Sequence, residues 1–418
     1  MRGECIVRAR WLVVDPSCVI ADGGLWIRDG RVERVLRTAR VPRGLAASAR
    51  RLDFGDAIVA PGLVNAHAHL ELSGLAGVLP RGRDFAGWIR ALLAARATQI
   101  PADWEAAARC GADRALATGT TTIGDIDTSG AALAGLRGHA LRVVHLREAL
   151  DAQDPSRTSF ALRRVSRRLP RRARRHEGLS PHAPFTVSPA LLNGLAKLAL
   201  RRDACVQMHW SETREEVEWM RSGGGPLAPL LGPSPRRSGL ELLADAGLLT
   251  RRLSLVHANH LLRGEAERLA RARATVVHCP GSHAWFERAP FPWRRYRAAG
   301  VRVALGTDSW ASNDDLDLRR ELRLASRAHS WLPPEELWAA ATTAGARALG
   351  LESLVGALRP GLCADWIVVR SAAATARRAM ESLCGAEAPV EQTWIEAEKA
   401  AEARPEPPSA RAHGRRSR

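Results

Sequence analysis

Two histidines, His67 and His69, stand two positions apart at the end of an apolar run, Ile58–Val64. That run is predicted to be a buried β-strand, whose side chains alternate between two faces with period two, so both imidazoles project to the same side. From neighbouring positions they can bind one metal ion. A His-x-His pair alone is weak support for a metal site, because such pairs also occur by chance on surfaces.

Further metal-competent side chains follow other apolar runs of the chain. They are His209 and Glu212 after Cys205–Met208, His257 and His260 after Leu253–Val256, His278 and His283 after Ala274–Val277, and Asp308 after Val301–Leu305. Each of them alone could be a core histidine or a helix-capping aspartate. Their recurrence at the ends of predicted strands indicates one shared site.

The elements that must position these residues alternate between strand-like and helix-like segments, the pattern of an α/β fold. The strand-like runs are Ile58–Val64, Thr120–Ile126, Leu141–Leu146, Gly178–Val187, Cys205–Met208, Leu253–Val256, Ala274–Val277 and Val301–Leu305. Helical periodicity appears between them, for example over Trp104–Thr118, Pro189–Leu200 and Gly264–Arg273. Eight such units predict a TIM-like (β/α)₈ barrel, in which chemistry occurs at the carboxyl ends of the strands.

Composition sets the broad class of the protein. The 418 residues carry a formal net charge of +18, but nearly all of the cations are arginines scattered along the chain, so no nucleic-acid partner is expected. Seven widely spaced cysteines without a C-x-x-C pair indicate a reducing compartment. No long apolar run is present, which predicts a cytoplasmic protein without a membrane partner. The oligomeric state is left open, and a homo-oligomer is compatible with the sequence.

The two ends of the chain differ from its middle. Residues 1–58 alternate short apolar runs with turn signals such as Asp22-Gly23-Gly24 and Asp29-Gly30, which predicts a small antiparallel β domain. The basic run Arg163–Arg175 is interpreted as a solvated loop or helix edge rather than an anion clamp. Residues 396–418 are rich in Pro, Ala and Arg, which predicts a disordered basic tail.

Several of these motifs together resemble the amidohydrolase superfamily. The segments are PGLVNAHAHLE, QMHWSET, LVHANHL, VVHCPGSH and GTDSWASND. They are similar to the metal-dependent deaminase branch, which includes S-adenosylhomocysteine and 6-aminodeoxyfutalosine deaminases, with guanine deaminases and chlorohydrolases as relatives. The resemblance covers about residues 1–370. It implies that Gly356–Val369 returns to complete a discontinuous β-sandwich, and so divides the chain into residues 1–58, a barrel over 59–348, and 349–395.

The resemblance also implies that His67, His69, His209 and Asp308 bind one divalent metal, with Zn²⁺ favoured and Fe²⁺ as the alternative. A second metal would need a carboxylated lysine at the end of the fourth strand. Lys197 lies beyond that strand, and the other lysine, Lys399, is far downstream. The predicted site is therefore mononuclear.

The family pattern assigns roles to three residues. Such an ion makes hydroxide available near neutral pH, Asp308 can accept a proton from the attacking water, and His257 can hold the attacking oxygen. Glu212 is expected to protonate a ring nitrogen of the substrate and then the leaving ammonia.

The predicted reaction is hydrolytic deamination of an aminopurine nucleoside or related N-heterocycle, a small-molecule substrate. Candidate substrate contacts are His182, Arg147, His278, Ser282, His283, Trp285 and Trp310, with Arg147 and Arg288 as partners for a substrate carboxylate. The stretch around His278 looks more like that of the 6-aminodeoxyfutalosine deaminases than that of the guanine deaminases, and the resemblance leaves an S-adenosylhomocysteine-like substrate open. The alternatives are a guanine- or cytosine-type deaminase, a chlorohydrolase-type C–X hydrolase, and a nucleic-acid-binding barrel.

Overall fold

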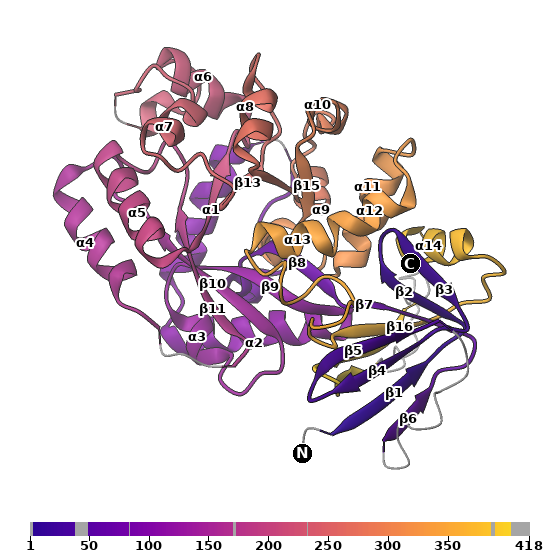
Figure 1. The fold of residues 1–418 in the computed structure, drawn as a ribbon. Helices are drawn as coiled ribbons and strands as arrows, with labels where there is room; N and C mark the ends of the chain where they lie inside the picture. Colours follow the sequence, from indigo (N-terminus) through magenta and orange to yellow (C-terminus); the bar gives the residue numbers. More distant parts are fainter. Residues whose placement is uncertain are drawn as a thin grey trace, which may run out of the picture.

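The structure, a computed structural model, describes residues 3–37, 49–82, 84–169, 173–231, 233–385 and 389–402. A barrel forms one side of the molecule, and two further β-sheets lie beside it (Figure 1). Within the described ranges, no helix is both long and apolar enough to cross a membrane.

Eight parallel strands form the barrel, each hydrogen-bonded to its neighbour in sequence. They are β8 (Leu63–Ala68), β9 (Thr120–Asp127), β10 (Arg142–Ala149), β11 (Arg175–Pro181), β12 (Cys205–Trp210), β13 (Leu253–His257), β14 (Thr275–His278) and β15 (Arg302–Leu305). The barrel closes where the carbonyl oxygen of His67 accepts hydrogen bonds from the backbone N–H groups of Thr307 (3.0 Å) and Asp308 (3.1 Å). The predicted (β/α)₈ architecture is therefore confirmed.

Helices surround the barrel (Figure 1). They are α1 (Phe85–Ala97), α2 (Pro101–Ala117), α3 (Ala131–Gly135), α4 (Pro155–Ser166), α5 (Pro189–Arg202), α6 (Arg214–Ser222), α7 (Gly239–Asp245), α8 (Glu265–Ala272), α9 (Pro280–Trp285), α10 (Trp293–Ala299), α11 (Leu318–Ala328), α12 (Pro334–Ala340), α13 (Thr343–Ala348) and α14 (Ala376–Gly385). The predicted helices over Trp104–Thr118, Pro189–Leu200 and Gly264–Arg273 correspond to α2, α5 and α8.

The predicted first strand, Ile58–Val64, in fact spans two strands of different sheets. β7 (Ala57–Pro61) belongs to the six-stranded sheet beside the barrel, and β8 begins at Leu63. Gly62 separates them, and a Cβ there would lie 2.3 Å from the side chain of Thr121, so a larger residue does not fit. The uninterrupted apolar run conceals this change of sheet.

The predicted fourth strand is displaced for a related reason. β11 ends at Pro181, and the residues from 182 to 188 form the loop that leads into α5. Apolar residues in this loop, such as Val187, are buried in the core and therefore extend the apolar run beyond the strand.

Two sheets flank the barrel, and both ends of the chain contribute to them. One has the order β5-β4-β1-β6 and the other β18-β17-β16-β7-β2-β3. The strands are β1 (Glu4–Arg8), β2 (Trp11–Asp15), β3 (Cys18–Ala21), β4 (Gly24–Arg28), β5 (Arg31–Leu36), β6 (Arg50–Asp53), β16 (Trp366–Arg370), β17 (Val390–Ile395) and β18 (Glu398–Glu402). Two pairings, β1 with β6 and β2 with β7, are parallel, so the prediction of an antiparallel β domain is wrong for these two pairs.

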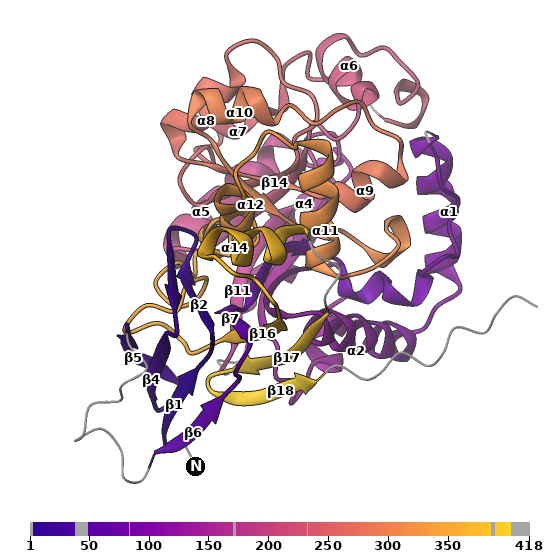
Figure 2. The same ribbon diagram turned by 90° about the vertical axis from the view of Figure 1, so that its right-hand side faces the viewer.

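The prediction of a disordered tail from residue 396 is wrong for its first part. β17 and β18 form a hairpin, with Glu396 and Ala397 in left-handed conformations at the turn (φ 51° and 64°). Figure 2 shows this hairpin beside α2, which both of its strands contact. Residues 403–418 lie outside the described part of the chain, as do residues 170–172 of the basic run, whose Arg163 and Arg164 are exposed at the end of α4.

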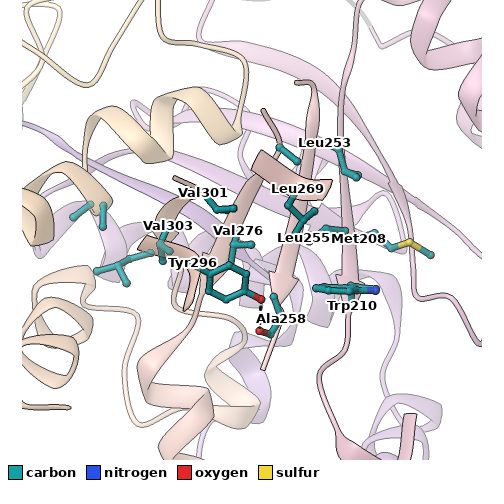
Figure 3. Close-up of a cluster of buried hydrophobic side chains, with 14 of the residues drawn as sticks. Met208, Trp210, Leu253, Leu255, Ala258, Leu269, Val276, Tyr296, Val301 and Val303 are labelled. Carbon is teal, nitrogen blue, oxygen red and sulfur yellow. Dashed lines mark hydrogen bonds between the residues drawn. The ribbon is translucent and has the colours of Figure 1, made fainter. Parts of the chain in front are cut away.

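The barrel strands place alternate residues against different cores. Met208, Leu255 and Val276 face outward into the cluster shown in Figure 3, which includes Leu269 of α8 and Tyr296 of α10. On the opposite face, Val64, Ile126, Val144 and Leu146 pack with Leu349, which follows α13. This division of faces determines which side chains reach the interior of the barrel.

A buried ion pair joins the barrel to the six-stranded sheet. Arg142, at the start of β10, donates to Asp365 at 3.2 Å and to Glu396 at 3.2 Å. The side chains of Arg142 and Asp365 are 3% and 4% exposed. Removing one partner of such a pair leaves a buried, poorly compensated charge, which is more costly than the loss of an exposed pair.

We therefore expect Asp365→Ala to lower the free energy of unfolding by about 3 kcal/mol, the lower end of the range for a buried pair because Glu396 remains. The matched control is Glu391→Ala, which removes the partner of Arg370 at an exposed site and should cost less than about 1 kcal/mol. Urea unfolding followed by tryptophan fluorescence measures both. Equal losses for the two variants would show that Arg142 is not a coupling point.

Candidate metal and catalytic site

Four side chains from three barrel strands converge at the carboxyl end of the barrel. His67 and His69 follow from β8, His209 from β12, and Asp308 lies just beyond β15. Asp308 Oδ1 is 3.5 Å from His67 Nε2 and 3.6 Å from His69 Nε2, and His69 Nε2 is 3.2 Å from His209 Nε2. The ligand atoms of His67, His69 and His209 lie within 4.8 Å of one another, as do those of His67, His257 and Asp308.

The hydrogen bonds behind two of these rings fix their tautomers. Gln207 Nε2 donates to the carbonyl oxygen of Ala66 at 2.9 Å, so Gln207 Oε1 accepts from His67 Nδ1 at 2.7 Å. His209 Nδ1 likewise donates to the carbonyl oxygen of His182 at 3.0 Å. Both rings therefore direct an unprotonated Nε2 at the same point, and the buried His67 Nε2 has no hydrogen-bond partner within the described residues. This is the arrangement that a metal ligand requires.

The electrostatics of the cluster agree with this interpretation. Burial, together with the neighbouring His67, holds the pKa of His69 well below its usual value and lowers that of His209 to about 3. Burial alone would raise the pKa of Asp308, but contacts with His67 and His257 hold it well below its usual value. Neutral histidines do not form ion pairs with an ionised aspartate. Together the three histidines and Asp308 offer three nitrogens and one carboxylate, a ligand set that suits a single divalent metal.

Two residues of the site have strained backbones. Asp308 and His257 are non-glycine residues in the left-handed region, with φ of 58° and 67°. Such conformations persist only where the surroundings impose them, and they cluster at functional sites. Asp308 is held by Ser282 Oγ (2.7 Å) and Ser312 Oγ (3.0 Å), which both donate to its Oδ2 and leave Oδ1 facing the histidines.

Glu212 lies beside the cluster, in the turn between β12 and α6. Its Oε2 is 3.7 Å from His257 Nε2, and its Oε1 accepts from Arg288 Nη2 at 2.9 Å. Burial raises the pKa of Glu212, and Arg288 opposes that rise. The guanidinium of Arg288 also lies over the rings of Phe85 and Phe286, 5.1 and 4.8 Å from their centroids. A carboxyl group in these surroundings can hold or release a proton next to the cluster.

Three other candidate residues lie at or next to this site. His182 contacts the His209 ring, with centroids 5.1 Å apart, and its Nδ1 is 2.8 Å from Thr186 Oγ1. His283 contacts Asn259 (Nδ1 to Oδ1, 3.2 Å), which itself donates to the backbone oxygen of Glu212 at 2.9 Å. Ser282 contacts Asp308 directly, so its place here is to orient that carboxylate.

Two other candidates lie away from the site, and the side chains of two more pack in apolar clusters. Arg147 donates to the backbone oxygens of Arg164 and Arg167, both at 2.5 Å, on the outer side of the barrel. His278 stacks on Phe291 with centroids 3.9 Å apart, facing the same outer core as Val276. Trp285 and Trp310 pack into apolar clusters beneath their loops. Strand alternation accounts for the first two, because both lie on outward-facing positions.

Two residues that the sequence reasoning missed face the site. Gln207 precedes His209 by two positions and so shares its face of β12, where it orients His67. Glu148 follows Arg147 directly and so faces inward with Val144 and Leu146. Its carboxylate forms a third cluster with His182 and His209, whose ligand atoms lie within 4.8 Å of one another. Period-two alternation from His209 would have found Gln207.

Comparison with known proteins supports the site's assignment to a family. The model of the amidohydrolase family matches residues 58–393. The aminodeoxyfutalosine deaminase of Deinococcus radiodurans is 34% identical over 326 residues, which cover 70% of this chain and 74% of that protein. The 5-methylthioadenosine/S-adenosylhomocysteine deaminase of Pyrococcus furiosus is 30% identical over 383 residues, covering 87% and 86%.

Solved structures share the whole architecture. An adenosine deaminase from Xanthomonas campestris with bound zinc has a TM-score of 0.81 at 26% identity, covering 95% of this chain and 92% of that one. The aminofutalosine deaminase of Helicobacter pylori in complex with methylthio-coformycin has a TM-score of 0.83 at 21% identity, covering 94% and 99%, a likeness of fold alone. The family model matches most of this chain, and the ends of the barrel strands carry the motifs that resemble the family. The chain therefore belongs to the amidohydrolase family.

Proposed function

We propose that this protein is a hydrolytic deaminase of adenine nucleosides that uses one divalent metal ion, Zn²⁺ with Fe²⁺ as the alternative. The observation that carries the proposal is the convergence of His67, His69, His209 and Asp308 on one point, with the carboxyl group of Glu212 beside it. The names of the relatives, aminodeoxyfutalosine deaminase and 5-methylthioadenosine/S-adenosylhomocysteine deaminase, support an adenine nucleoside with a modified sugar substituent. The zinc in the Xanthomonas adenosine deaminase supports the choice of ion.

The roles of the residues follow from their positions. When bound, the ion would acidify water and so supply the nucleophile at neutral pH. Asp308, held by two serine hydroxyls, accepts a proton from the attacking water through Oδ1. His257 donates a hydrogen bond that orients the attacking oxygen. Glu212 gives its proton to the ring nitrogen next to the reacting carbon, takes up the proton of the added hydroxyl group as that oxygen becomes the carbonyl, and passes it to the amino group, which departs as ammonia. The proton held by Asp308 then returns to Glu212 through solvent and restores both groups.

Arg288 has a different role in this arrangement from the one expected from sequence. Its guanidinium is already paired with Glu212 and stacked on two phenylalanine rings, so it holds the catalytic carboxyl group in place. Arg288 could bind a substrate carboxylate only if its guanidinium divided its hydrogen bonds between that carboxylate and Glu212, or released Glu212. Arg147 points away from the site, so neither arginine stands free as a carboxylate clamp.

The direct test of the function is ammonia release from a panel of substrates. The panel contains adenosine, 5′-methylthioadenosine, S-adenosylhomocysteine, 6-aminodeoxyfutalosine, guanine and cytosine. We expect turnover of one or more of the adenine nucleosides and none of the two free bases. If only guanine or cytosine is deaminated, the protein is a deaminase of free bases. If no compound of the panel releases ammonia, the proposal is rejected.

The metal site generates a second prediction. Purified protein should contain about one divalent ion per chain, and Gln207→Leu should weaken metal binding about 10–100-fold, because the hydrogen bond that orients His67 is lost. Gln207→Glu keeps an acceptor for His67 Nδ1 and should recover most of the affinity. Metal analysis after dialysis against graded chelator concentrations measures both variants. Two ions per chain, or an unchanged affinity in Gln207→Leu, would contradict the proposed ligand geometry.

The proton-transfer role generates a third prediction. Glu212→Gln should retain the metal, because Glu212 is not one of the four ligands, but should lower kcat by about 10²–10⁴-fold, the typical contribution of a general acid/base. Glu215→Gln, three positions further along the chain, is the matched control and should keep its activity. The ammonia assay and metal analysis give both quantities. A fully active Glu212→Gln variant would assign the proton transfer to another residue.

A further inference from the structure

Glu321 is a buried carboxylate of α11 that binds two segments of the barrel at once. The residue is 0% exposed. Its Oε2 accepts a hydrogen bond from the backbone N–H of Gly281 at 2.5 Å, and its Oε1 accepts one from Asn313 Nδ2 at 2.9 Å. Gly281 lies in α9, after strand β14, and Asn313 lies in the loop after strand β15. Glu321 therefore joins the segments that follow two neighbouring strands.

One of these two hydrogen bonds leads to Asp308 through α9. Gly281 directly precedes Ser282, whose hydroxyl group donates to Asp308 Oδ2 at 2.7 Å. A Cβ on Gly281 would lie 2.5 Å from Glu321 Oε1, so the backbone can approach the carboxylate this closely only because residue 281 is a glycine. The contact between Gly281 and Glu321 thus fixes the backbone next to the Ser282 hydroxyl group.

The other hydrogen bond leads to Asp308 through the loop after β15. Asn313 directly follows Ser312, whose hydroxyl group donates to Asp308 Oδ2 at 3.0 Å. The same amide nitrogen of Asn313 donates to the backbone oxygen of Thr307 at 2.7 Å, one residue before Asp308. Both donors to Oδ2 are therefore carried by segments that Glu321 binds, and these donors leave Oδ1 facing the histidines.

The chemistry of the two partners explains why a carboxylate occupies this position. Both partners are N–H donors, so both oxygens of the side chain must act as acceptors. A glutamine has almost the same shape but would present its own N–H group to one of the two donors. Because a buried donor without an acceptor is costly, Glu321→Gln removes one of the two contacts without changing the volume of the side chain.

On these observations, and resting on the function proposed above, we propose that Glu321 is a positioning residue for Asp308. It holds the segments after β14 and β15 in the arrangement in which both serine hydroxyl groups reach Oδ2. Glu321 acts on the metal site and on the proton transfer through Ser282 and Ser312, and it does not bind the substrate. Groups that orient a metal-ligating side chain typically change metal affinity or activity about 10–100-fold.

The first experiment compares Glu321→Gln with the wild-type enzyme holding its metal. We expect the metal affinity to fall about 10–100-fold in a chelator titration, and kcat at saturating metal to fall by a similar factor. KM should stay within about threefold of wild type, because the groups that bind the nucleoside are left in place. With cobalt(II) as the bound ion, the visible absorption spectrum should change, because it reports the ligand geometry. A loss of stability alone would change neither kcat of the folded enzyme nor this spectrum.

The matched control is the same substitution at another buried carboxylate. Glu265, at the start of α8, is also buried and accepts a hydrogen bond from the backbone N–H of Leu262 at 2.8 Å. Glu265→Gln therefore removes a buried carboxylate that holds a different loop, the one after β13. It should lower stability but keep metal affinity and kcat within about twofold of wild type, since it leaves both serine contacts with Asp308 in place.

A double-mutant cycle tests the path through the serines. Ser282→Ala/Ser312→Ala removes both donors to Asp308 Oδ2 and should itself lower metal affinity and kcat. In this background, Glu321→Gln should change either quantity by less than about twofold, because the contacts through which Glu321 acts are already absent. The serine variant keeps Glu321, so it tests the proposal even if Glu321→Gln does not fold. Wild-type metal affinity and kcat in the serine variant would then overturn it.

The outcomes separate this inference from the function on which it rests. A wild-type metal affinity, kcat and cobalt spectrum in Glu321→Gln would overturn the positioning role. An equal loss in Glu265→Gln, or a full further loss in the serine background, would overturn it too, because Glu321 would then act by another route. If no compound of the panel releases ammonia, the proposed function fails, while the metal affinity and the cobalt spectrum still decide for or against Glu321.

Discussion

The site depends on one feature of the backbone, the closure of the barrel at His67. The carbonyl oxygen of His67 accepts hydrogen bonds from two consecutive N–H groups just after β15, and the second of these belongs to Asp308. The same pair of segments thus joins the first and last strands and brings the His67 ring to the Asp308 carboxylate. A ligand set drawn from both ends of a sheet can exist only if the sheet closes in this register.

A glycine makes that approach possible. Gly306 lies between β15 and Thr307, and a Cβ at this position would come within 2.9 Å of the backbone oxygen of His67. On the other side of the closure, Asn65 Nδ2 donates to Thr307 Oγ1 at 2.8 Å, and its Oδ1 accepts from the N–H groups of His67 and Thr307. These contacts connect the motifs NAHAH and GTD physically, because Asn65 of the first forms hydrogen bonds with Thr307 of the second.

The sequence predicts the barrel and the residues that converge at the carboxyl ends of its strands, because both leave clear patterns in short stretches of sequence. Apolar runs mark the strands, and each proposed ligand follows its run within five residues. What it could not predict was the direction of side chains near the strand ends. Arg147 and His278 are predicted substrate contacts that face the outer core, whereas Glu148, one position from Arg147, faces inward. Choosing between neighbours requires the register of the strand, which an apolar run does not define to a single residue. Two other differences have separate causes: an uninterrupted apolar run conceals the change of sheet at Gly62, and the Pro-, Ala- and Arg-rich composition of the tail conceals the turn at Glu396.

The discontinuous pairing beside the barrel also has a consequence for synthesis on the ribosome. β7, which leads directly into the first barrel strand, lies between β2 and β16, and the apolar cluster beneath it combines Leu12 and Val59 with Trp366 and Trp394. Those tryptophans are translated more than three hundred residues after their partners. The amino-terminal strands therefore leave the ribosome without part of the layer that covers them, and this part is missing until Trp366 and Trp394, which follow the barrel, have been translated. Contacts this distant in sequence close slowly, so the nascent chain is exposed to aggregation until the segment that carries Trp366 and Trp394 has been synthesised.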